Sequence, residues 1–210
     1  MLKVGLTGGM ACGKSTVGEM FVQLGAHLIQ ADLIGHQLML PGQSVYEEVV
    51  RHFGPQILNA DRTIHRAQLA EAAFGGDGKP SRIEELNCIV HPAVIRHQEQ
   101  WMEEVGRADP HAIAIVEAAL ILESHTADRF DKLIVVTCDE EQRAERFARR
   151  QELDMDAARA EVRRRMAAQL PDSEKIKAAD FVIDNSGPLE ATERQVREVW
   201  RKMNGATVSS

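Results

Sequence analysis

The sequence predicts an α/β fold in which a five-stranded parallel sheet lies between two layers of helices. Short apolar runs alternate along its 210 residues with segments whose apolar residues follow the 3.6-residue period of a helix. Several runs are apolar at every position, which is typical of parallel strands covered by helices on both faces. A glycine-rich turn directly after the first run, closed by lysine and serine, is typical of a strand that leads into a phosphate-binding helix.

The elements of the sheet and its first and last helices can be placed in order. The expected strands are Lys3–Thr7, His27–Ala31, Ala112–Val116, Lys132–Thr137 and Phe181–Ile183. A helix is expected from Lys14, with Gly25 as its C-terminal glycine and an apolar face of Val17, Met20, Phe21 and Leu24. After a turn over residues 184–188, the last helix should bury Leu189, Val196, Val199, Trp200 and Met203. The tail from Asn204 is expected to fray.

Two longer intervals predict additions to the sheet. Residues 33–108 are mostly helical in pattern, interrupted at Pro41-Gly42, at Gly54-Pro55 and over Gly75–Pro80, and exceed what one crossover helix needs. The segment from Arg143 to Ala178 carries eight arginines between Arg143 and Arg165, interleaved with acids, and is expected to be exposed helix. We therefore expect a single domain with a core over about 1–31, 109–142 and 179–203, a helical lobe over about 32–108 and a lid over about 143–178.

Composition limits the classes of function. The net charge is −7 and the pI is near 5.6, which argues against a nucleic-acid surface as the main partner. The three cysteines are widely spaced without a CxxC pair, as in a reducing compartment. The N-terminal run is too short for a signal peptide, and the longest apolar stretch, Ala112–Leu122, is too short for a bilayer. We expect a cytoplasmic protein without a membrane partner, as a monomer or a weak homo-oligomer.

The strongest motif is the segment Gly8–Ser15, which we call the phosphate loop. It reads GGMACGKS and matches G-x-x-x-x-G-K-[ST] completely, between the first strand and the first helix. Glycines let backbone N–H groups turn toward phosphate oxygens, and the helix directs its positive end at the same anion. Lys14 is expected to reach the β- and γ-phosphates of ATP, and Ser15 to bind Mg²⁺. Cys12 is expected to contribute its backbone N–H.

Three classes of phosphate-loop protein are possible. A GTPase would need an N-K-x-D guanine reader, which the sequence lacks. Motor and AAA-type ATPases are normally larger. Small size, an inserted lobe and a late arginine-rich segment favour a metabolite kinase, in which the lobe holds the acceptor and arginines close over the phosphates. Within this class, the phosphate acceptor could be one of several small metabolites or a nucleotide. A regulatory nucleotide-binding protein, which belongs to a different class, is the other alternative.

Further residues, in order along nearly the whole chain, resemble the dephospho-CoA kinase family. The resemblance rests on the segment Gly5–Thr16, Ala31-Asp32, Pro41-Gly42, Phe53-Gly54, Arg66 with Leu69, Leu86-Asn87, His91-Pro92, Gln169, Lys175, Ala179-Asp180 and Asp184–Gly187. It implies a P-loop kinase core with a helical acceptor lobe and a small lid. The implied reaction transfers the ATP γ-phosphate to the ribose 3′-hydroxyl of dephospho-CoA, giving CoA and ADP as the last step of coenzyme A synthesis, with Mg²⁺.

The sequence departs from the family pattern in four places. Gln30-Ala31-Asp32 keeps only the last acid of the usual Asp-Ala-Asp, and Arg62 follows Asp61 where glycine is usual. The third strand ends in Glu117-Ala-Ala rather than in Asp followed by Ile-Pro. Arg146 and Arg150 fit the R-x-x-x-R spacing of the lid only after one extra residue.

Several charged residues have an expected catalytic or binding role and a structural alternative. Asp32 is expected to accept the hydroxyl proton because it ends the second strand, or else caps a helix. Glu117 would hold Mg²⁺ through water, or is a buried paired carboxylate. Arg146 would be catalytic, and Arg150 would bind nucleotide, whereas Arg159, Arg163, Arg164 and Arg165 are expected to form a solvated or ion-paired face.

The resemblance supplies the remaining assignments. Besides Lys14 and Ser15, the implied nucleotide-binding residues are Gly8, Gly9, Ala11, Cys12, Gly13, Thr16 and Asn185, the last near adenine unless it only forms a turn. The implied acceptor-binding residues are Thr7, Asp32, Arg66, Asn87 and His91, the last of which is otherwise structural.

Overall fold

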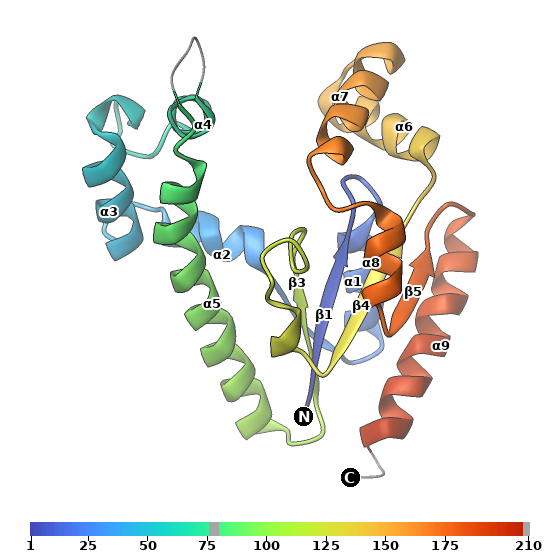
Figure 1. The fold of residues 1–210 in the computed structure, drawn as a ribbon. Coiled ribbons are helices and arrows are strands. Elements are labelled where there is room, and N and C mark those ends of the chain that lie inside the picture. Colours follow the sequence, from blue (N-terminus) through green and yellow to red (C-terminus); the bar gives the residue numbers. More distant parts are fainter. Residues whose placement is uncertain (76–79, 208–210) are drawn as a thin grey trace. The chain divides into compact units, whose positions relative to one another are not determined.

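The computed structural model describes residues 1–75 and 80–207, and the chain forms two compact units (Figure 1). The first unit comprises Met1–Ile29 and Met102–Ser210, and the second comprises Gln30–Trp101. Most of the expected loop Gly75–Pro80 lies outside the described residues. Each unit has its own apolar core.

A parallel five-stranded sheet organises the first unit, so the predicted α/β class is confirmed. The strands are β1 (Leu2–Gly8), β2 (His27–Gln30), β3 (Ile113–Glu117), β4 (Lys132–Thr137) and β5 (Phe181–Asp184), in the order β2-β3-β1-β4-β5. In the central strand, Leu6 lies opposite Glu117 on one side and Ile134 on the other. This register places the end of β3 next to the end of β1, where the phosphate loop begins.

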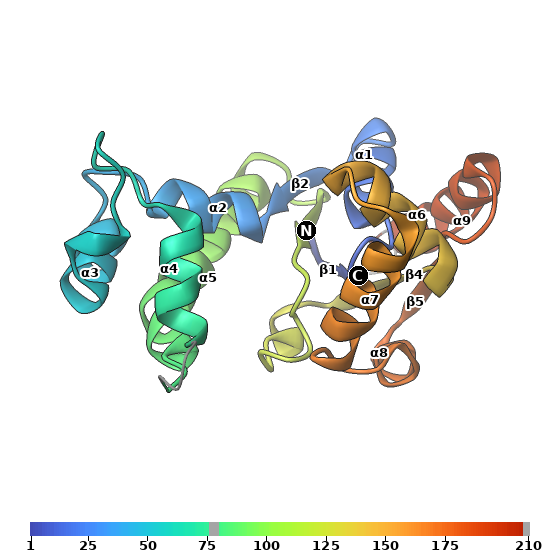
Figure 2. The same cartoon turned by 90° about the horizontal axis from the view of Figure 1, so that it is seen from above.

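Helices cover both faces of the sheet, which explains its continuous apolar runs. Figure 2 shows α1 (Lys14–Gln23) and α9 (Leu189–Thr207) on one face and α8 (Asp172–Ala178) on the other. Strand β4 supplies both layers: Ile134 and Val136 pack with α1 and α9, whereas Leu133 and Val135 pack in a second cluster that includes Phe130. Every side chain of such a strand gains from being apolar.

The last helix corrects two expectations. Val196, Val199 and Met203 are buried as predicted, but Leu189 is 52% exposed because it is the first residue of α9 and precedes the buried stripe. The helix also continues to Thr207, which contradicts the expected fraying over Asn204–Thr207, whereas residues 208–210 of the expected tail lie outside the described residues. In its last turns, the side chain of Asn204 donates to the carbonyl of Trp200 at 3.2 Å.

The arginine-rich segment forms α6 (Glu140–Gln151) and α7 (Met155–Ala167), which share a core that includes Phe147 and Val162. The expected ion-paired face is present, with Arg159, Arg163, Arg164 and Arg165 bound to Glu140, Glu141 and Glu161. The expectation of a wholly exposed segment is wrong. Arg143 in α6 and Lys175 in α8 have fully buried side chains, because each forms an ion pair inside the unit.

The second unit is helical, as predicted for most of residues 33–108. It contains α2 (Ala31–Leu38), α3 (Ser44–Phe53), the short η1 (Pro55–Ile57), α4 (Arg66–Phe74) and most of α5 (Ile83–Ala108), which continues into the first unit. Its core joins Val49 and Phe53 of α3 to Leu69 of α4 and Val90 of α5. Within the described residues, no helix is both long and apolar enough to span a membrane.

Candidate phosphate-binding site

The phosphate loop connects the end of β1 to the start of α1, as the motif predicts. Its backbone turns sharply. Ala11 has a φ of 55° and Gly13 a φ of 89°, and both values lie in the left-handed region that residues other than glycine seldom adopt. Helix α1 starts at Lys14, so its unpaired N–H groups and positive end face the loop. This arrangement suits an anion with several oxygens.

The side chain of Lys14 folds back over the loop. Its ammonium donates to the carbonyl of Gly8 at 3.0 Å and to that of Gly9 at 3.2 Å. These acceptors are neutral, so an anionic phosphate in the loop would bind the ammonium more strongly. The conformation holds the charge of Lys14 against the first two residues of the loop.

Ser15 and Glu117 form a second feature of the site. The Ser15 hydroxyl donates to Oε1 of Glu117 at 2.8 Å, across 102 residues of sequence. Glu117 is the last residue of β3 and is 8% exposed, whereas Ser15 and Thr16 are exposed. Two oxygen ligands at this spacing suit Mg²⁺, which is commonly held by one or two protein groups together with substrate phosphates. Glu117 is thus both buried and hydrogen-bonded, as its alternative assignment requires.

Thr7 supports the chain that follows Glu117. Its side chain is fully buried, and its hydroxyl donates to the carbonyl of Ala119 at 3.3 Å. The hydrogen bond ties the end of β1 to the segment that follows β3.

Behind the loop, Asn185 and Arg146 fix the carbonyl of Cys12. Nδ2 of Asn185 donates to it at 2.8 Å and Nη1 of Arg146 at 3.3 Å, while Nη2 of Arg146 donates to the carbonyl of Asn185 at 2.9 Å. Thr192 donates to Oδ1 of Asn185 at 2.9 Å, so the buried amide is anchored at both ends. A Cβ at Gly13 would lie 2.2 Å from Nδ2, so this packing requires glycine there.

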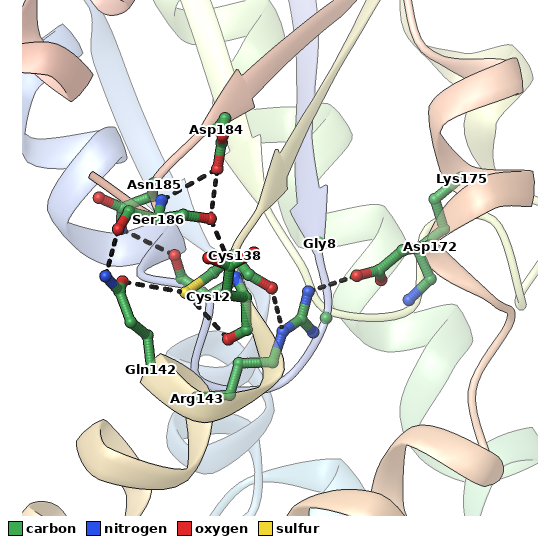
Figure 3. A network of polar contacts seen from close by, with 12 residues as sticks. Gly8, Cys12, Cys138, Gln142, Arg143, Asp172, Lys175, Asp184, Asn185 and Ser186 are labelled. Atoms are coloured by element: carbon green, nitrogen blue, oxygen red, sulfur yellow. Dashed lines mark hydrogen bonds and ion pairs between the residues drawn. The ribbon is translucent and has the colours of Figure 1, made fainter.

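Arg143, which the sequence interpretation did not single out, lies against the phosphate loop at Gly9. Figure 3 shows its guanidinium between Cys138 and Asp172, close to the strand end at Gly8. Nε donates to the carbonyl of Cys138 at 2.8 Å, and Nη2 pairs with the carboxylate of Asp172. The available signal was its position three residues before Arg146, which places both arginines on one face of α6.

The thiol of Cys138 lies in the same region. Burial raises the pKa of this thiol, an effect that the charges of Arg146 and Arg143 oppose without cancelling. Cys138 therefore remains a neutral thiol near pH 7, and Nη1 of Arg146 lies 3.2 Å from its sulfur.

The other predicted site residues are on helices α2, α4, α5 and α6. Arg150 is an exposed residue near the end of α6. Four predicted residues belong to the second unit, where Asp32 is exposed in the first turn of α2 and Arg66 is the exposed first residue of α4. Asn87 and His91 lie on α5, half-buried and exposed respectively. The N-cap alternative for Asp32 is wrong, because α2 begins at Ala31 and Gln30 occupies the cap position.

Comparison with known proteins gives consistent matches over nearly the full chain. Residues 2–191 match the sequence model of a family described as dephospho-CoA kinase. A dephospho-CoA kinase of Leifsonia xyli is 38% identical over 205 residues, covering 98% of this chain and 100% of the relative. One of Geobacter metallireducens is 40% identical over 202 residues and covers 96% of both chains. A crystal structure of a Thermus thermophilus protein, 30% identical, covers 96% of this chain and 97% of its own with a TM-score of 0.77.

Proposed function

The chain belongs to the dephospho-CoA kinase family, and from that premise we propose how its residues carry out the reaction. The γ-phosphate of ATP is transferred to the ribose 3′-hydroxyl of dephospho-CoA, giving CoA and ADP in the last step of coenzyme A biosynthesis. The hydroxyl oxygen forms the new P–O bond, the bond from the γ-phosphorus to the β-phosphate oxygen breaks, and the hydroxyl proton leaves. The observation that carries this proposal is the phosphate loop with Lys14 folded over it.

The phosphate loop is proposed to bind the triphosphate of ATP. Backbone N–H groups from Gly8 to Thr16 and the positive end of α1 bind the oxygens, and Lys14 follows the charge as it moves to the β-phosphate. The loop is already shaped by Asn185 and Arg146, which hold the carbonyl of Cys12. Little reorganisation is then needed when ATP binds. Asn185 acts here as a positioning residue, rather than only as part of a turn.

Arg146 is proposed to stabilise the charge that develops during transfer. Its guanidinium already contacts the loop backbone at Cys12, so a small side-chain movement brings it to a phosphate oxygen. An arginine in this role contributes several powers of ten in rate in other phosphoryl-transfer enzymes. Arg150, four residues later on α6, is proposed to bind nucleotide from its exposed position.

Asp32 is proposed as the group that orients the 3′-hydroxyl and accepts its proton. It follows the carboxyl end of β2, its side chain is exposed, and α2 does not use it as a cap. A carboxylate within hydrogen-bonding reach of a hydroxyl can orient it and accept its proton.

Mg²⁺ is proposed to bind at Ser15 and Glu117 together with phosphate oxygens. The hydroxyl and the carboxylate supply hard oxygen ligands 2.8 Å apart. Phosphate oxygens of the nucleotide and water molecules would supply the remaining ligands of the ion. The ion would neutralise charge on the β- and γ-phosphates.

The acceptor is proposed to contact Arg66, Asn87 and His91 in addition to Asp32, while Thr7 contributes to acceptor binding indirectly. Arg66 and His91 have exposed side chains, as contact with a substrate requires, whereas Thr7 is buried and would act by holding the chain after β3. We further propose that the protein works in the cytoplasm as a monomer or a weak homo-oligomer, with ATP and dephospho-CoA as its ligands. Its charge of −7 gives no reason to expect a nucleic-acid partner.

A coupled ADP-release assay with ATP, Mg²⁺ and dephospho-CoA tests the function. AMP and CMP serve as alternative acceptors, and a reaction without acceptor detects simple hydrolysis. ADP release that requires dephospho-CoA, with CoA identified by mass, is the expected result. Equal turnover on AMP or CMP would favour a nucleotide kinase, and slow hydrolysis independent of any acceptor would favour a regulatory protein.

A further inference from the structure

Arg143 has a charged donor that the folded protein does not use. Its side chain is fully buried, and Nη1 has no hydrogen-bond partner. The only other buried side-chain atoms in this condition, among the described residues, are Oε2 of Glu123 and Nζ of Lys175. Those two residues form an ion pair at 2.8 Å that is not aligned as a hydrogen bond, so each keeps a close counter-charge.

The guanidinium is fixed in place by its other two nitrogens. Nε is bound to the carbonyl of Cys138 at the end of β4, and Nη2 is bound to Asp172 at the start of α8. With two corners of a planar group held, the direction of the third is set. Nη1 therefore cannot turn to another acceptor without breaking these contacts.

That third corner lies against the phosphate loop. A Cβ built on Gly9 would lie 2.0 Å from Nη1 and 3.3 Å from Oδ1 of Asp172. Any side chain at this position would displace the guanidinium, so Gly9 is needed for close approach. Arg143 and the loop backbone are therefore packed directly against one another.

A buried donor without a partner costs free energy, and the cost is larger for a charged donor than for a neutral one. Such a cost is offset when a ligand supplies the missing acceptor. An oxyanion is the partner that a guanidinium binds best, and the loop beside Nη1 is the phosphate site.

We propose that Arg143 is a further phosphate-binding residue, whose Nη1 donates to a phosphate oxygen of the nucleotide held by the phosphate loop. The proposal rests on the proposed function only in that the loop binds ATP. Asp172 holds Nη2 and partly neutralises the charge of the guanidinium, and asparagine in its place would keep an oxygen acceptor for Nη2 without that negative charge. Removing the charge of Asp172 should therefore strengthen nucleotide binding, whereas removing that of Arg143 should weaken it.

Calorimetric titration of the whole protein with ATP and Mg²⁺, without acceptor, tests the proposal. For Arg143→Gln we expect the affinity for ATP to fall about tenfold or more, the usual effect of losing one charge-assisted hydrogen bond. For Asp172→Asn we expect an affinity equal to or above that of the wild type, despite a lower melting temperature. Arg149→Gln removes the same charge from an exposed position of α6 and should leave the affinity unchanged within twofold.

A purely structural role gives a different pattern. Arg143→Gln and Asp172→Asn would then lower the melting temperature and the ATP affinity together, and this result would overturn the proposal. An unchanged affinity in Arg143→Gln would also overturn it and would assign a water molecule to Nη1. Should Arg143→Gln not fold, Asp172→Asn decides: a loss of affinity contradicts the proposal, and a gain supports it. A wild type that does not bind ATP would overturn the proposed function as well.

Discussion

The hydroxyl of Ser15 donates to Oε1 of Glu117 at 2.8 Å, joining the first turn of α1 to the last residue of β3. The contact is possible because β1 and β3 are adjacent and parallel, with Leu6 opposite Glu117. Two strand ends far apart in the sequence thereby place a hydroxyl and a carboxylate together beside the phosphate loop.

The first prediction concerns magnesium. Glu117→Gln keeps an acceptor for Ser15 but removes the charge, so we expect the Mg²⁺ concentration for half-maximal activity to rise about tenfold. Activity measured against Mg²⁺ at saturating ATP tests this, with the exposed Glu145→Gln on α6 as the control. A variant that loses stability but keeps its Mg²⁺ dependence would support the purely structural assignment of Glu117.

The second prediction concerns Lys14. Lys14→Ala removes the side-chain charge that contacts the carbonyls of Gly8 and Gly9. We expect kcat to fall by about a factor of 10³ or more, since transfer depends on electrostatic stabilisation. Lys202→Ala, at an exposed position of α9, is the matched control. Near-native kcat in Lys14→Ala would contradict the assignment of the loop.

The variant Asp32→Asn is expected to lower the rate of phosphate transfer without weakening ATP binding. Asp32→Asn keeps the shape of the side chain and removes its basicity, so kcat is expected to fall roughly 10²- to 10⁴-fold while the dissociation constant for ATP changes little. Single-turnover rates and ATP titration measure the two quantities, and Glu48→Gln on an exposed position of α3 is the control. Equal losses in both would indicate a structural role.

Asn185 should be required for stability. It is 4% exposed, donates to the carbonyl of Cys12 and accepts from Thr192. Asn185→Ala leaves both partners without it, so the free energy of unfolding should fall by about 1–3 kcal/mol. Denaturant melts of Asn185→Ala, Thr192→Val and the double variant should be non-additive. Fully additive losses would show that the Asn185–Thr192 hydrogen bond contributes nothing.

Glu85 should make a pH-dependent contribution to the stability of the second unit. Hydrogen bonds from Arg82 and then His52, each at 2.7 Å, lower the pKa of Glu85 from 4.5 to about 2. Because the folded-state pKa is depressed, this stabilisation is complete above the unfolded value of 4.5 and disappears as the pH falls toward 2. The urea midpoints of the wild type and Glu85→Gln should differ at pH 7 and converge below pH 4.5.

The adjacent Glu84→Gln provides the control for that comparison, because Glu84 is exposed. It should follow the wild type at every pH. A gap between the wild type and Glu85→Gln that persists unchanged to pH 3 would contradict the pKa shift.

The strands and the phosphate loop could be predicted from the sequence because their signals are local. The run Leu133–Val136 is apolar at every position and lies within β4, which spans the predicted residues Lys132–Thr137, and GGMACGKS has one common backbone conformation. The ends of helices could be predicted less well, as Leu189 and Asn204 of α9 show. Whether a residue at the end of a helix is buried or helical depends on which other elements pack beside it.

Arg143 could not be distinguished from its seven neighbouring arginines by sequence alone. Its burial depends on three partners remote from one another along the chain, namely Gly9, Cys138 and Asp172. Composition correctly predicts that most arginines of such a segment are exposed. The burial of Arg143 depends on tertiary contacts, which the spacing of residues in the sequence does not reveal.

Met10 and Ala11 of the phosphate loop are partly buried and pack against the core shared by α6 and α7. The tip of the phosphate loop therefore has two roles: its side chains pack against the hairpin formed by α6 and α7, and its backbone is shaped to bind phosphate. Any motion that lifts the hairpin transfers part of Met10 to water, at a cost that approaches about 1.5–3 kcal/mol for complete exposure. Backbone amides in the loop tip and in both helices should accordingly exchange with deuterium as one cooperative unit, slowed together when nucleotide binds.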